Sequence, residues 1–87
     1  MNQTILRSQL MADLTIQLSA ATSVENAINT VRRALRVTGL TNTPLLNETD
    51  VTHLLQAIAA EGGLLESIAQ QIATSGIADY IEQTKAA

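Results

Sequence analysis

The sequence predicts an all-α fold, a compact bundle of about five short helices in which an N-terminal helical hairpin packs against a C-terminal three-helix unit. Aliphatic residues recur at spacings of three and four from Ile5 to Ile81, which is the period of an amphipathic helix. Capping residues and glycines divide this pattern into segments of ordinary helix length. A length of 87 residues fits one domain, residues 1–87. Because the chain has no Phe or Trp, we expect a thin core of interlocking aliphatic side chains.

The first helix is predicted over residues 3–20, and it has two apolar faces. Ile5, Ala12 and Ile16 lie close together on one side. A small bundle has little interior left to cover this strip, so we expect it to pair with its counterpart in a homodimer. The opposite ridge consists of Leu6, Leu10, Leu14 and Leu18.

The second helix is predicted over residues 23–38 and has the clearest signals in the chain. Thr22 and Glu25 have the spacing of a capping box. Gly39 can take the left-handed conformation that often ends a helix. The predicted core face consists of Val24, Ala27, Ile28, Val31, Leu35 and Thr38.

Residues 40–47 form a linker with helix-breaking chemistry. Pro44 lacks an amide donor and disfavours a helical residue before it. The leucines of this linker indicate that it packs against the bundle. A third helix is predicted over residues 49–61, capped by Asn47 or Thr49 and ended by glycines at 62–63. Fourth and fifth helices follow over residues 64–74 and 77–84, on either side of Gly76.

Side chains that perform chemistry are scarce. The chain has no Cys and one His, His53, whereas a zinc site needs three or four ligands. Glu61 and Glu66 flank the glycine turn, but the sequence around them gives no reason for one to act as an acid and the other as a base. We therefore expect no catalytic residue, no cofactor and no metal, and we expect His53 to be an exposed helix residue.

The strongest polar feature is a cluster of Arg32, Arg33 and Arg36 on one side of the second helix. Guanidinium groups bind carboxylates or phosphates through paired hydrogen bonds. Residues 1–40 carry four Arg against two acidic residues, whereas residues 41–87 carry one Lys against six acidic residues. The cluster is expected either to pair with Glu25 or the acidic half of its own chain, or to bind an acidic protein partner. Because the chain has a net charge of −3, we do not expect nucleic acid to be its main partner.

The segments LLQAIAAEGG, LLESIAQQIA, TSG and IADYIEQ resemble the three-helix core of helix-turn-helix and winged-helix regulators. In that resemblance, residues 74–76 supply the turn and residues 77–83 correspond to the recognition helix. A recognition helix presents Arg, Lys, Asn or Gln to bases and phosphates, whereas this one carries Asp79 and Glu82. We therefore expect the unit to serve protein contact.

The predicted function is that of a small, non-enzymatic protein-interaction module, a regulatory or adaptor subunit that acts as a homodimer in the cytoplasm. The alternative is a helix-turn-helix transcriptional regulator that binds DNA, and a third possibility is a structural subunit of a larger assembly. Polar side chains interrupt every long apolar window, so no membrane span is expected. The start MNQTILRSQL lacks the basic and apolar regions of a signal peptide, and the absence of Cys fits the cytosol.

Overall fold

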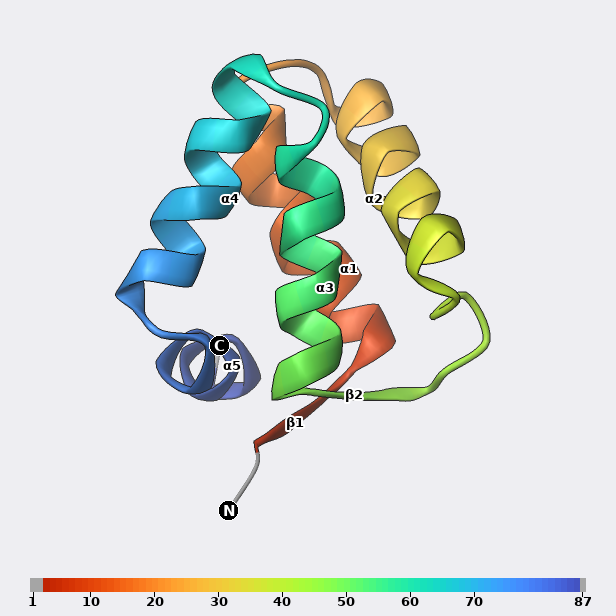
Figure 1. The fold of residues 1–87 in the computed structure, drawn as a ribbon, viewed down its shortest axis with the longest axis vertical. Coiled ribbons are helices and arrows are strands. Elements are labelled where there is room, and N and C mark those ends of the chain that lie inside the picture. Colours follow the sequence, from red (N-terminus) through yellow and green to blue (C-terminus); the bar gives the residue numbers. More distant parts are fainter. Residues whose placement is uncertain (1–2, 87) are drawn as a thin grey trace.

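The computed structural model describes residues 3–86 and shows a bundle of five helices with one two-stranded ribbon (Figure 1). The prediction of a small all-α bundle is confirmed. No helix in this part of the chain is long and apolar enough to span a lipid bilayer. In chain order the elements are β1 (Thr4–Leu6), α1 (Arg7–Ser19), α2 (Val24–Thr38), β2 (Leu45–Asn47), α3 (Glu48–Ala59), α4 (Gly63–Ser75) and α5 (Ile77–Ala86).

The helices pack as the predicted hairpin and three-helix unit. α1 and α2 run antiparallel, and in Figure 1 α3 lies in front of α1, between α2 and α4. α5 is seen almost end-on in Figure 1, so it runs across α3 and α4 and also reaches α1. Gly76 alone separates α4 from α5, and its φ of 105° is a conformation that side chains with a Cβ rarely adopt. This glycine therefore permits the sharp turn that lays α5 across the bundle.

The helix ends follow local capping chemistry. Asn47 begins α3 with a complete capping box: its side chain accepts from the Asp50 amide at 2.8 Å, and the Asp50 carboxylate accepts from the Asn47 amide at 3.1 Å. At the start of α2 the cap is Ser23, whose hydroxyl accepts from the Asn26 amide at 3.1 Å. The predicted cap at Thr22 is wrong by one residue, because the Thr22 hydroxyl accepts from the side-chain amide of Asn26 and not from the backbone.

The N-terminal segment differs from its prediction. Residues predicted to begin the first helix are extended, and β1 pairs antiparallel with β2 inside the predicted linker. Ile5 lies opposite Leu46, and both side chains are buried in the core, with exposed fractions of 1% and 0%. On the other face of the ribbon, Leu6 and Leu45 lie opposite each other and are about half exposed. An extended segment can bury Ile5 beside Leu46, and the hydrogen bonds of the ribbon replace those of the missing first turn.

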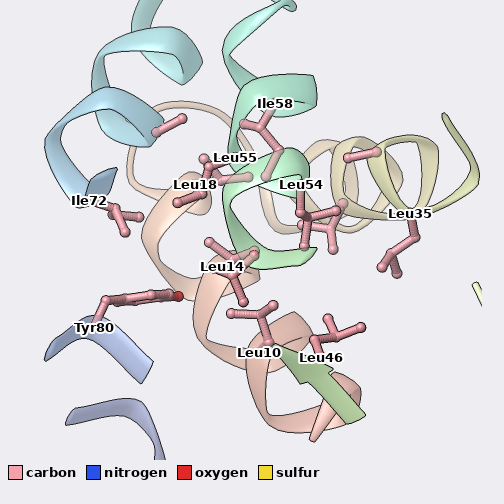
Figure 2. Close-up of a cluster of buried hydrophobic side chains, with 14 of the residues drawn as sticks. Leu10, Leu14, Leu18, Leu35, Leu46, Leu54, Leu55, Ile58, Ile72 and Tyr80 are labelled. Atoms are coloured by element: carbon pink, nitrogen blue, oxygen red, sulfur yellow. The ribbon is translucent and has the colours of Figure 1, made fainter. Parts of the chain in front are cut away.

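The core is an aliphatic layer to which all five helices and both strands contribute side chains (Figure 2). Leu10, Leu14 and Leu18 are completely buried along α1, as the predicted ridge requires, and Leu54 and Ile58 are completely buried on α3. Each such side chain contributes roughly 1.5–3 kcal/mol when fully buried. Figure 2 shows the Tyr80 ring entering this layer from α5 with its hydroxyl end directed toward α1.

Two members of the core faces predicted for the first two helices lie outside the core. Val24, the first residue of α2, is 59% exposed. Leu6 is 47% exposed because it belongs to β1, where the side chains alternate between faces. The helical period therefore identified the centres of the apolar faces and failed at their ends.

Candidate functional site

Among the described residues, 3–86, the predicted cluster on α2 divides into one arginine with an acidic partner and two without one. The Arg33 Nη2 atom lies 3.1 Å from Glu61 Oε1, at the turn between α3 and α4. The same guanidinium group donates to the Thr30 hydroxyl at 3.3 Å. Both partners of the Arg33–Glu61 pair are partly exposed, and pairs of that kind contribute at most about 1 kcal/mol. Arg33 thus connects α2 to the acidic half of the chain.

Arg32 and Arg36 face a different neighbour, Arg7, which is the first residue of α1. The three side chains line one surface hollow of about 280 Å³ between the N-terminal end of α1 and the C-terminal end of α2. We call this hollow the arginine pocket. Its complete lining is Arg7, Met11, Arg32, Leu35, Arg36 and Thr41.

The secondary structure fixes where these arginines stand. Arg32 and Arg36 are four residues apart on α2 and therefore lie on the same side of the helix. The Arg7 amide donates to the Pro44 carbonyl oxygen at 2.9 Å, which ties the start of α1 to the linker. The Arg7 guanidinium group donates to the Thr41 carbonyl oxygen, 34 residues away in sequence. These contacts bring Arg7 to the rim of the arginine pocket.

The floor of the arginine pocket is apolar and its rim is basic. Leu35 is buried and Met11 is partly buried against the core, whereas Arg32 and Arg36 are exposed. Within residues 3–86, none of Arg7, Arg32 and Arg36 forms an ion pair with an acidic side chain. Three positive charges around one hollow repel one another unless an anion neutralises them. The arrangement can therefore bind a carboxylate or phosphate through bidentate hydrogen bonds, with an apolar group against the floor.

Sequence reasoning missed Arg7. It lies far from Arg32 in the sequence, and no local pattern connects the two. The antiparallel hairpin already brings the start of α1 near the end of α2. The contacts that hold Arg7 there, to Pro44 and Thr41, depend on how the linker packs and have no signal in the sequence.

The predicted dimer strip is not a continuous surface. Ile5 is buried in β1, so its assignment to an exposed strip is wrong. Ala12 and Ile16 do lie on the exposed side of α1, and Ile16 is 69% exposed. They line a shallow hollow of about 230 Å³ together with Thr84 of α5. The strip is therefore shorter than predicted and borders α5.

A second polar cluster, also missed, joins α5 to α1. The Tyr80 hydroxyl donates to Asp13 Oδ2 at 2.5 Å, and Gln17 Nε2 donates to the same oxygen at 2.7 Å. Burial, reinforced by the hydrogen bond to the Asp13 carboxylate and by its negative charge, raises the pKa of Tyr80 well above its ordinary value. The phenol therefore stays protonated and acts as a fixed hydrogen-bond donor.

The remaining candidates for chemistry lie apart from one another. His53 is exposed on α3, as expected from its position opposite the core face. Glu61 is engaged by Arg33, which leaves Glu66 without the partner that an acid–base pair needs. Among residues 3–86, no group of three His, Asp or Glu side chains is close enough to hold a metal ion.

Comparison with known proteins gives no relative for this chain: no protein-family model, no curated protein and no solved structure matches it. The arginine pocket is therefore interpreted from its own geometry.

Proposed function

We propose that this chain is a small, non-enzymatic protein-interaction module, a regulatory or adaptor subunit, that binds an acidic surface of a partner protein. The observation that carries the proposal is the arginine pocket, in which three arginines from two helices surround one apolar floor and form no ion pair with an acidic side chain of residues 3–86. Arginine is enriched among the residues that dominate protein–protein binding energies. An acidic partner would supply the missing counter-charges.

The charge distribution favours a protein over DNA as the partner. The chain has a net charge of −3, and the helix that resembles a recognition helix exposes Asp79 and Glu82. Nucleic-acid binding draws most of its non-specific affinity from neutralised phosphates, so an acidic surface opposes it. The helix-turn-helix regulator remains the alternative to be tested. The absence of Cys supports cytoplasmic action, where disulfides rarely persist.

The test is affinity capture from native lysate with the wild-type chain and two charge-matched variants. The first variant is Arg32→Gln with Arg36→Gln, which removes two charges from the arginine pocket. The control is Arg33→Gln with Lys85→Gln, which removes two charges elsewhere. We expect a protein whose recovery falls about tenfold or more with the first variant and is unchanged with the control, and whose binding is reproduced by calorimetry with purified components.

Two outcomes would contradict the proposal. If no captured protein distinguishes the two variants, the arginine pocket does not bind proteins. If mixed genomic DNA binds more tightly than about 10 μM at physiological salt, with a steep salt dependence that is lost in the Arg32/Arg36 variant, the regulator becomes the better interpretation.

Self-association is part of the same proposal. Ile16 is a large apolar side chain open to solvent, and Ala12 beside it would let a second helix approach closely. The surface of α1 from Ser8 to Ser19 carries one charged residue, Asp13, which is already hydrogen-bonded to Tyr80 and Gln17. A surface with a single charged side chain repels its own copy only weakly. The same contact would serve a structural subunit of a larger assembly, the third function considered.

A further inference from the structure

We infer that the arginine pocket recognises an amphipathic peptide segment of the partner, in which a carboxylate binds the arginines while an adjacent aliphatic side chain packs on Met11 and Leu35. This inference rests on the proposed function and specifies the chemistry of the partner. It predicts that negative charge alone is not sufficient for full affinity.

The arginine pocket combines basic side chains with an apolar floor. A site for charge alone needs no apolar floor, yet Met11 and Leu35 lie between the arginines and the core. Arg32 and Arg36 can lay their aliphatic stems along such a floor while the guanidinium groups stay in water. Charge at the rim and aliphatic surface at the base therefore match a ligand with the same two parts.

The size of the arginine pocket limits how much of a ligand it can hold. Its volume of about 280 Å³ lies just below the range of roughly 300–1,000 Å³ that is typical for drug-sized ligands and cofactors. It suits one or two amino-acid side chains. Since two or three arginines can each take a carboxylate, a short segment with a leucine between two glutamates satisfies both the floor and the rim.

A third observation concerns the ribbon that leads into α1. Leu6 directly precedes Arg7 in the sequence, and it lies opposite Leu45 in the β1–β2 ribbon. Both leucines are about half exposed, so the ribbon also offers aliphatic surface to a partner.

The experiment measures fluorescence anisotropy of three labelled peptides with the full chain. The first has two glutamates flanking one leucine, the second has serine in place of the leucine, and the third has glutamine in place of both glutamates. We expect the first to bind about tenfold more tightly than the second, because burying one leucine supplies an affinity gain of that size. The third should bind weakly, and added salt should reduce binding of the first and second alike.

Variants of the protein assign the effect to the arginine pocket. Met11→Gln, checked for an unchanged helical circular dichroism spectrum, should reduce the affinity of the leucine peptide to that of the serine peptide and leave the serine peptide unaffected. Leu64→Gln changes an exposed leucine of α4 outside the pocket and is the matched control. Met11→Leu should preserve binding of the leucine peptide, since it keeps an aliphatic floor.

The failures of the two proposals are distinguishable. Equal affinity for the leucine and serine peptides would overturn the amphipathic ligand while leaving an acidic partner in place. Equal affinity for the glutamate and glutamine peptides would overturn both. If free octanoate displaced the labelled leucine peptide at concentrations below that of the peptide, the ligand would be a small fatty acid and not a peptide. If inorganic phosphate alone displaced the leucine peptide, the apolar floor would have no role in binding.

Discussion

The hydrogen bond between Tyr80 and Asp13 predicts a loss of stability in alkaline solution. The folded chain holds the Tyr80 phenol protonated because the ring is buried and the hydroxyl faces a carboxylate. In the unfolded chain the same phenol ionises with an ordinary pKa of about 10. Since the folded-state pKa is the higher one, the stability is fully present below about pH 10 and is lost as the pH rises above it.

The magnitude follows from this difference. At about pH 11, one unit above the ordinary pKa, ionisation stabilises the unfolded chain by about 1.4 kcal/mol relative to neutral pH. Small domains have total stabilities of roughly 5–15 kcal/mol, so this is a measurable fraction. Tyr80→Phe should remove this pH-dependent loss. At neutral pH the same variant should cost about 1–2 kcal/mol, because Asp13 loses one donor and keeps Gln17.

The assay combines urea unfolding with a spectroscopic titration. Tyr80 is the single tyrosine and the chain has no Trp, so tyrosinate absorbance reports on this residue alone. All other side chains are the same in the wild type and the variant, so their contributions cancel in the comparison. A phenol that ionises near its ordinary pKa in the folded protein would refute the reasoning, as would an equal alkaline loss of stability in the Tyr80→Phe variant.

Three further predictions concern the core, the capping box and assembly. Leu14→Ala should lower the free energy of unfolding in urea by about 3–5 kcal/mol, because Leu14 is completely buried. Asn29 is exposed, so Asn29→Ala should lower it by less than about 0.5 kcal/mol, and the reverse order would mean that the helix faces are assigned wrongly. Asn47→Ala should cost about 1–2 kcal/mol because it removes one half of the capping box. Thr49→Ala, two residues later in the first turn of α3, should change little, so equal effects would argue against the cap. The wild-type chain should be a dimer in light scattering, and Ile16→Glu should be a monomer with unchanged helical content; a wild-type monomer at high micromolar concentration would remove the homodimer from the proposal.

Most of the fold could be predicted because its signals are local. The centres of the apolar faces, Gly39 at the end of α2 and Asn47 at the start of α3 each depend on residues within one or two turns. The N-terminal segment could not, because a strand of three residues is too short to show an alternating pattern. Ile5 fits a helical ridge and a strand equally well, and its partner Leu46 is distant in sequence. The spacing of apolar residues alone therefore gave the wrong structure there.

The candidate site also has one part that local sequence predicts and another that depends on distant contacts. Helical spacing grouped Arg32, Arg33 and Arg36 as one cluster on α2. It could not show that Arg33 turns to Glu61 while the other two face Arg7, because each choice depends on which element packs against that part of α2. The positive charge of the surface was predictable from composition, and the arginine pocket itself was not.

The β1–β2 ribbon also has a consequence for the order of folding. Pairing Thr4–Leu6 with Leu45–Asn47 closes a loop that contains all of α1 and α2, and the entropic cost of closure rises with loop length. We therefore expect the helical hairpin, with its nearer contacts, to form before the ribbon. Arg7 reaches Thr41 only when the ribbon is closed, so the edge of the arginine pocket formed by these two residues should be its last part to assemble and the first to open. Native-state hydrogen exchange would show this as faster exchange at the Arg7 amide, which bonds to Pro44, than at amides in the middle of α1.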